Sequence, residues 1–130
     1  MEEAIRILVV DDEPDIRRIC RILLETGGYT VLEAATGAEA VEQVRQHPEL
    51  DLILMDIMMP EMDGLETTKA IRGLSREDAG SVPIIAMSAN AFADDITRSK
   101  AAGMNAHLSK PLDFEELFRT IKRYGGAGAS

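Results

Sequence analysis

The chain has 130 residues, the length of one domain, and a chain of this size buries roughly 65–70% of its unfolded surface on folding. Hydrophobic residues make up 45% and charged residues 28%, which is typical of a folded domain and excludes a disordered chain. The formal net charge of −9 argues against non-specific nucleic-acid binding, because neutralising phosphates requires a basic surface.

The first elements in chain order are a strand and a helix. Ile5–Val10 is almost entirely apolar, as expected for a strand covered on both faces. Pro14 suits the first turn of a helix, and Gly27-Gly28 ends it. One face of this helix carries the apolar residues Ile16, Ile19, Cys20 and Leu23.

The same alternation continues to the end of the chain. Four further strands are predicted over Tyr29–Glu33, Asp51–Met55, Val82–Met87 and Asn105–Ser109. Helices are predicted around Ala40–Val44, Leu65–Arg72, Asn90–Ala102 and Phe114–Ile121, the last capped by Asp113. A βα unit repeated five times predicts an α/β fold, a single (βα)5 domain with a doubly wound parallel sheet.

The compartment is indicated by three features of the sequence. The single cysteine, Cys20, forms no internal disulfide, which suits a reducing cytoplasm, and we expect it in the core. The N-terminal residues lack the basic start and apolar run of a secretory signal. No apolar stretch approaches the roughly 18–20 residues that span a membrane. We therefore expect a cytoplasmic protein without membrane contact.

Polar residues follow four of the predicted strands. Asp11, Asp12 and Glu13 come after the first strand, Asp56 after the third, Ser88 after the fourth and Lys110 after the fifth. In a doubly wound sheet, ligands bind beyond the carboxyl ends of the strands, so these side chains are expected to converge at one edge.

The chemistry of this edge is that of magnesium and phosphate. Clustered carboxylates repel one another, and Mg²⁺, which prefers oxygen ligands, would relieve the repulsion. One carboxylate could attack a phosphoryl group and form an aspartyl phosphate, with Lys110 and the Ser88 hydroxyl stabilising the phosphoryl oxygens. These arguments select phosphoryl chemistry but do not identify the aspartate that is attacked.

Four motifs carry a resemblance to a known family. They are LVVDDE (Leu8–Glu13), LMDIMMPEMDG (Leu54–Gly64), PIIAMSAN (Pro83–Asn90) and AGM…LSKP (Ala102–Pro111). Together, and in this order at the ends of predicted strands, they resemble the receiver domains of two-component response regulators. The resemblance covers about residues 5–124. It implies a flavodoxin-like sheet of order 2-1-3-4-5, a receiver domain over 1–124 and a flexible tail or linker over 125–130.

The resemblance assigns roles to the acidic residues. Asp56 would be the phosphoacceptor, taking the phosphoryl group from a phosphohistidine on a histidine kinase or a histidine-phosphotransfer domain. Asp12 would bind Mg²⁺ directly and Asp11 mainly through water, together with Asp56 and the main-chain carbonyl of Met58. The protein would not be a conventional enzyme, since it would catalyse its own phosphorylation and dephosphorylation.

The resemblance also implies a switch. Lys110 would pair with the phosphate, Ser88 would move to hydrogen-bond it, and the surface of the fourth helix, fifth strand and fifth helix would rearrange. His107 stands where the family more often has a Tyr or Phe that flips. Two interpretations of it stay open, a switching residue and a partly exposed strand histidine.

The partners are implied more coarsely. The donor is expected to dock along the first helix, whose outer face would carry Arg17, Arg18 and Arg21; a solvated surface without a partner is an equally open interpretation of these arginines. The motifs most resemble receiver modules of hybrid sensor kinases, and a free-standing receiver is the alternative. We expect no direct DNA binding, since 130 residues leave no room for an output domain, and a monomer or a phosphorylation-dependent dimer.

The same residues allow rival interpretations. Asp11, Asp12 and Ser88 could simply cap helices, and a receiver-like scaffold could act without phosphorylation. A Rossmann enzyme is disfavoured because no G-x-G-x-x-G motif is present. A haloacid-type phosphatase would need a second Asp where Met58 stands.

Overall fold

The computed structural model describes residues 5–59, 61–74, 82–88, 100–110 and 112–124. They contain a five-stranded parallel sheet of order β2-β1-β3-β4-β5, as expected. The strands are β1 (Arg6–Val10), β2 (Thr30–Ala34), β3 (Leu52–Asp56), β4 (Ile84–Ser88) and β5 (Ala106–Ser109). The helices that the structure describes in full are α1 (Pro14–Thr26), α2 (Gly37–Gln46), α3 (Gly64–Arg72) and α6 (Phe114–Tyr124). The flavodoxin-like (βα)5 fold is thereby confirmed.

Some predicted segments lie outside the described residues. The helix expected over 90–102 is one of them, apart from its last three residues, 100–102, which are helical. The tail expected over 125–130 is another. Within the described part of the chain, no helix is both long and apolar enough to cross a membrane.

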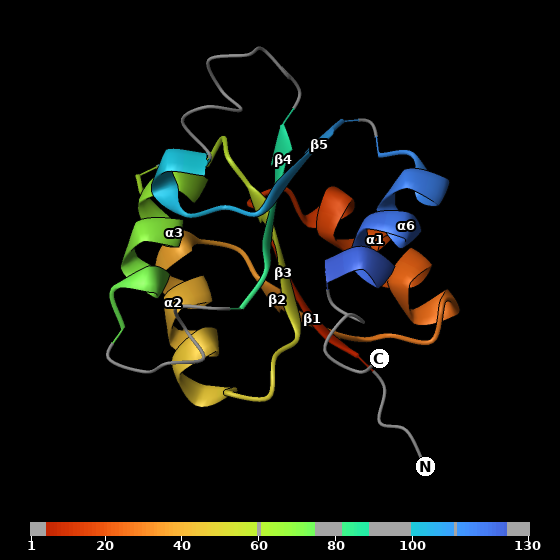
Figure 1. The fold of residues 1–130 in the computed structure, drawn as a ribbon, viewed down its shortest axis with the longest axis horizontal. Coiled ribbons are helices and arrows are strands. Elements are labelled where there is room, and N and C mark those ends of the chain that lie inside the picture. Colours follow the sequence, from red (N-terminus) through yellow and green to blue (C-terminus); the bar gives the residue numbers. More distant parts are fainter. Residues whose placement is uncertain (1–4, 60, 75–81, 89–99, 111, 125–130) are drawn as a thin grey trace.

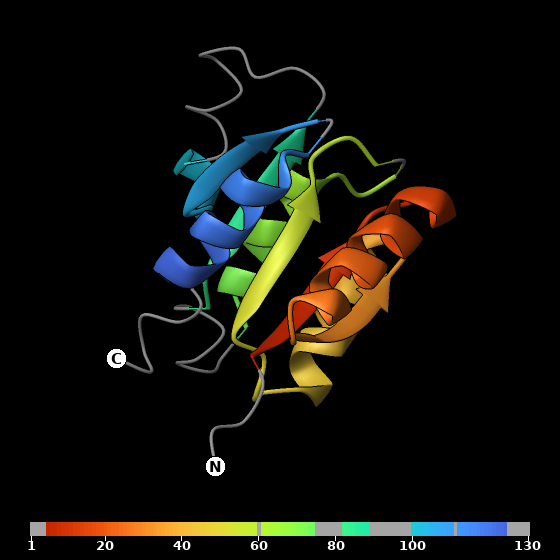
Figure 2. The same cartoon turned by 90° about the vertical axis from the view of Figure 1, so that its right-hand side faces the viewer.

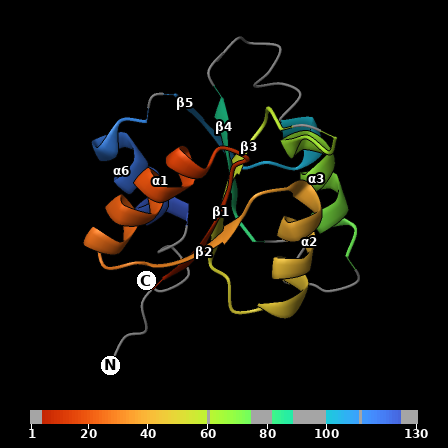
Figure 3. The same cartoon turned by 180° about the vertical axis from the view of Figure 1, so that it is seen from behind.

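The sheet lies between two helical layers, with α2 and α3 on one face and α1 and α6 on the other (Figure 1). Figure 3 shows the same layers from behind. Successive strand residues point to opposite faces, so each central strand supplies both cores. Leu8, Val10, Ile53 and Met55 pack towards α2 and α3, whereas Ile7, Val9, Leu52 and Leu54 pack towards α1 and α6.

The α1 helix buries a narrower stripe than its apolar pattern predicts. Cys20 and Leu24 are buried, while Ile19 is exposed. The apolar stripe is wide enough to cover the sheet and also to face α6, which lies alongside α1 on the same face of the sheet (Figure 2). Part of that stripe is therefore left at the surface beside α6.

Two strands extend one residue further than predicted. Asp56 and Ser88 are the last residues of β3 and β4, and do not lie beyond them. The reason is that strand pairing continues past the apolar run, with the Ile57 N–H donating to the Met87 carbonyl at 3.0 Å. The backbone of both polar residues is consequently fixed by the sheet itself.

The start of α3 is pressed against the end of β3. Its N-cap Asp63 forms a capping box with Glu66, which fixes where the helix begins. A Cβ atom on Gly64 would collide with the Asp56 carbonyl oxygen and with the Ile57 backbone. Glycine at this position lets the helix approach the strand end that carries Asp56.

Candidate functional site

Three carboxylates gather at the carboxyl edge of the sheet and form what we call the acidic cluster: Asp11, Asp12 and Asp56. Each offers an oxygen that lies within 4.8 Å of the other two. Asp11 is 0% exposed and Asp56 3%, and Asp12 is the most exposed of the three. An oxygen-rich, largely buried set of this kind suits a hard divalent cation such as Mg²⁺.

Lys110, directly after β5, pairs with the two buried carboxylates. Its Nζ atom lies 3.0 Å from Asp11 Oδ2 and 3.3 Å from Asp56 Oδ1. The alternation of side chains along a strand explains why they meet. Leu54 and Leu108 face α1 and α6, and Asp56 and Lys110, each two residues further on, point to the same face of the sheet. The parallel sheet brings these separated residues to one point.

Burial and mutual repulsion change the protonation of the site. Burial raises the pKa of Asp56 to about 6, helped by the negative charge of Asp11 and opposed by Lys110. Burial would lower the pKa of Lys110, but its pairs with Asp11 and Asp56 outweigh this and raise it. The lysine therefore stays charged, while Asp56 is a more basic carboxylate than an exposed one.

Main-chain donors orient the carboxylates. The Glu13 N–H donates to Asp11 Oδ1 at 3.0 Å, and the Met58 N–H donates to Asp56 Oδ1 at 3.3 Å. The N-cap of α1 is Glu13, whose side chain makes no capping bond, so neither Asp11 nor Asp12 is at the cap position. The interpretation of these two aspartates as caps of α1 is wrong.

The other predicted site residues surround the cluster. Ser88 is buried at the end of β4, where its carbonyl accepts a hydrogen bond of 2.8 Å from the Lys110 N–H. The Met58 side chain is 73% exposed, so it does not shield the cluster as a buried residue would. His107 lies half-buried in β5, beside Ala86 in the register and on the opposite face from Leu108. Its role as a switch remains a prediction.

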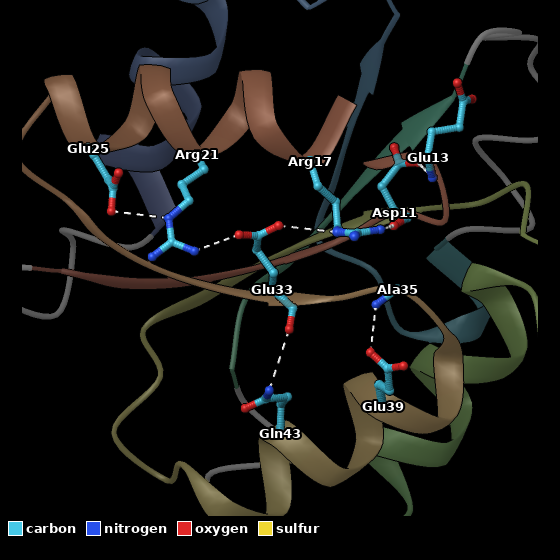
Figure 4. Close-up of polar contacts among 9 residues, drawn as sticks. All are labelled: Asp11, Glu13, Arg17, Arg21, Glu25, Glu33, Ala35, Glu39 and Gln43. Carbon is cyan, nitrogen blue, oxygen red and sulfur yellow. Dashed lines mark hydrogen bonds and ion pairs between the residues drawn. The ribbon is translucent and has the colours of Figure 1, made fainter. Parts of the chain in front are cut away.

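A charged network that was not predicted from the sequence lies beside the cluster (Figure 4). Arg17 and Arg21, expected on the outer face of the first helix as a docking surface or as solvated residues, both pair with Glu33 of β2, at 3.2 and 2.6 Å. Arg17 also donates to the Asp11 carbonyl. One signal could have revealed this, since Glu33 is an acidic residue in a predicted strand beside the first one. Arg18 is exposed, as predicted.

Comparison with known proteins identifies the family. The profile of the response regulator receiver domain matches residues 7–122. The chain belongs to this family. It is 37% identical over 120 residues to the polar-differentiation response regulator DivK of Brucella ovis, covering 92% of this chain and 95% of DivK.

Two solved receiver domains extend the comparison. One belongs to a sensor histidine kinase of Pseudomonas aeruginosa and has a magnesium ion coordinated in its active-site cleft. It is 37% identical, with a TM-score of 0.86, and the match covers 96% of this chain and all of that one. The other is the receiver domain of yeast (Saccharomyces cerevisiae) Ssk1, crystallised with the histidine phosphotransfer protein Ypd1. It is 28% identical, with a TM-score of 0.88, over 100% of this chain and 94% of that one.

These comparisons make the chain a receiver module of two-component signalling and not a conventional enzyme. Its acidic cluster, Asp11, Asp12 and Asp56, is of the kind found in phosphoaspartate switches and could hold a metal ion. The resemblance drawn from the four sequence motifs is confirmed.

Proposed function

We propose that this receiver domain is a phosphorylation switch in which Asp56 accepts a phosphoryl group from a phosphohistidine of a partner protein. The observation that carries the proposal is the environment of Asp56. It is a buried carboxylate at the end of the central strand, next to a second buried carboxylate and a half-buried lysine. Burying charged carboxylates costs free energy of folding, and a structural role alone does not explain why the sheet would bury two of them side by side.

The transfer step exchanges one bond to phosphorus for another. An Asp56 carboxylate oxygen attacks the phosphorus atom, the P–O bond forms and the P–N bond to the partner's imidazole breaks. The imidazole nitrogen keeps the electron pair of that bond. The raised pKa of Asp56 makes its ionised form a better nucleophile than an ordinary aspartate. Lys110, already next to Asp56, is positioned to neutralise the incoming phosphoryl oxygens.

The residues also fit Mg²⁺, the cofactor of the proposed reaction. Asp12 and Asp56 would hold it with carboxylate oxygens and Asp11 mainly through a bound water, and the Met58 main-chain carbonyl would complete the protein ligands. When bound, Mg²⁺ would neutralise charge on the phosphoryl oxygens and orient them. Lys110 is then shared between the protein carboxylates and the phosphate.

We further propose that phosphorylation is read out on the other side of β4. Ser88 would turn towards the phosphoryl group, and its strand neighbours would carry the change to β5, His107 and α6. The link is short, because the Ser88 carbonyl already accepts from the Lys110 N–H. Much of the expected switch surface, residues 91–99, lies outside the described part of the chain.

An apolar groove between α1 and the start of α6 supports a docking site for the donor. It has a volume of about 260 Å³ and is lined by Ile19, Leu23, Phe114 and Lys110, among others. Ile19 and Phe114 are exposed, as is Ile22 nearby on α1. Because Lys110 belongs to both the groove and the site, a histidine-phosphotransfer domain or kinase held there would present its phosphohistidine beside Asp56. The co-crystal of Ssk1 with Ypd1 supports a partner of this kind.

Phosphoryl transfer in the presence of Mg²⁺ tests the proposal. The wild-type domain should acquire label from a phosphorylated histidine-phosphotransfer protein, and Asp56→Asn should acquire none. Asp51→Asn is the matched control, since Asp51 lies at the opposite end of β3, where it accepts from the Arg6 N–H. Stable labelling of Asp56→Asn would contradict the assignment. A wild-type domain that takes no label would favour the alternative, a scaffold that acts without phosphorylation.

A further inference from the structure

Arg17 is the charged side chain of α1 that reaches the backbone of the acidic cluster. Its Nη1 atom donates to the Asp11 carbonyl oxygen at 2.8 Å, and its Nε donates to Glu33 Oε1 at 3.2 Å (Figure 4). The side chain is 18% exposed, so it is held between α1 and β2 and does not extend into solvent. The guanidinium thus connects two elements of the fold to the loop that follows β1.

The carbonyl that Arg17 holds has a particular importance. It belongs to the peptide unit that joins Asp11 to Asp12, so its orientation determines where the Asp12 side chain leaves the backbone. The preceding peptide unit is fixed separately, by the Asp11 N–H donating to the Ala34 carbonyl at 3.2 Å. Arg17 therefore restrains the step between the buried carboxylate and the more exposed one.

Glu33 keeps the guanidinium away from the carboxylates. A cation this near the acidic cluster would otherwise be attracted to it and compete with Mg²⁺. Glu33 binds Arg17 through one carboxylate oxygen and Arg21 through the other. The hydrogen bond to Arg21 is the largest cause that lowers the pKa of Glu33, and burial opposes it. The Glu33 carboxylate therefore stays ionised. The charge of Arg17 is thereby compensated by Glu33, while its Nη1 atom donates to the Asp11 carbonyl.

We propose that Arg17, braced by Glu33, is a positioning residue that orients the Asp11–Asp12 peptide for divalent-cation binding. The proposal rests on the metal site of the proposed function and deepens it. It predicts a change in Mg²⁺ affinity of the opposite sign from the change expected of electrostatics alone. Removing a nearby positive charge should tighten Mg²⁺ binding, whereas removing a positioning residue should weaken it.

The test is a Mg²⁺ titration followed by amide chemical shifts, on wild-type domain and on variants of α1. Arg17→Ala should weaken Mg²⁺ binding by about tenfold, the lower end of the effect of residues that orient metal ligands. Arg18→Ala is the matched control, because it removes the same charge from an exposed position on the same helix. It should leave the affinity unchanged or slightly tighter. Arg17→Lys, which keeps one donor within reach, should recover part of the loss.

Further measurements separate positioning from general stability. Without Mg²⁺, Arg17→Ala should move the Asp12 amide resonance, which reports on the peptide unit concerned, more than amides in β4. Urea unfolding of each variant shows how much stability is lost. Arg17→Lys carries the test if Arg17→Ala does not fold. Because it keeps the positive charge, a charge effect alone would leave its Mg²⁺ affinity unchanged, whereas the loss of the guanidinium geometry should lower that affinity.

The outcomes distinguish this inference from the proposed function. If the wild-type domain binds no Mg²⁺, the proposed metal site is wrong, and this inference is overturned with it. If the wild-type domain binds Mg²⁺ and Arg17→Ala binds it equally well or more tightly, the metal site stands and the positioning role is overturned. An equal loss in Arg18→Ala would also overturn it, since the effect would then not depend on the contact between Arg17 and the Asp11 carbonyl.

Discussion

The body of the sheet and its carboxyl edge differ sharply although they are neighbours on the same strands. Val10 is followed by Asp11, Met55 by Asp56 and Met87 by Ser88, and all six residues are buried. In the body, burial removes apolar surface from water and stabilises the fold. At the edge, burial removes charged and polar groups from water and opposes folding.

The difference teaches that the edge is supported by the body. Compensation at the edge comes from one lysine and from main-chain donors, and it is incomplete, because the pKa of Asp56 remains raised to about 6. Proteins keep such unfavourable groups where they serve a reaction. Mutations in the two regions should therefore change stability in opposite directions.

The largest expected effect is in the body. Leu54→Ala removes a fully buried side chain from the centre of β3 and should lower the free energy of unfolding by about 2–5 kcal/mol in urea denaturation. The matched control is Met58→Ala, which truncates an exposed apolar side chain four residues further on and should change stability by less than about 0.5 kcal/mol. Similar values for the two variants would contradict the division between body and edge.

The next effect is at the edge and has the opposite sign. The native pKa of Asp56, about 6, is above its ordinary value of 3.8, so the folded state binds this proton more tightly. Asp56 therefore destabilises the fold progressively as the pH rises through this window, by up to about 3 kcal/mol above it. Asp56→Asn should be more stable than the wild type at pH 7, and the difference should vanish near pH 4. Unfolding curves across this range, without Mg²⁺, measure it, and a constant difference would refute it.

A smaller effect is expected at the junction of the two regions. Gly64→Ala places a Cβ against the backbone of Asp56 and Ile57, and the resulting shift should cost about 1–3 kcal/mol of unfolding free energy. It should also move the amide resonances of those two residues. Gly73→Ala at the other end of α3 is the control, since its Cβ would meet ordinary contacts of 3.4 Å or more. We expect Gly73→Ala to be neutral or slightly stabilising.

The body of the sheet was the more predictable region. Buried parallel strands are continuous apolar runs, so all five strands were located from sequence to within two residues. The convergence of Asp11, Asp56 and Lys110 followed from the rule that strand ends meet at one edge. What the apolar pattern could not give was the strand ends themselves, because the last pairing residues, Asp56 and Ser88, are polar.

The direction of single polar side chains was the least predictable property. Arg17 was expected at the outer face of α1, but it stands three and seven residues before the buried Cys20 and Leu24, on the same side of the helix. The apolar stripe of α1 is so wide that the sequence did not show which side of the helix faces the sheet. The partner of Arg17, Glu33, could not be identified either, because it belongs to β2. The close approach at Gly64 was unpredictable for a similar reason, since it depends on how α3 packs against β3.

The contact between Lys110 and Asp11 has a consequence for how the protein is made. The two residues are 99 positions apart, so the cation that compensates the buried carboxylates is made long after they are. During synthesis, both acidic strand ends emerge from the ribosome well before Lys110, and a parallel sheet of such non-local contacts forms late. A fragment that stops before β5 would carry the carboxylates without their lysine. Synthesis of β5 and Lys110 is thus a condition for the compensated site to form.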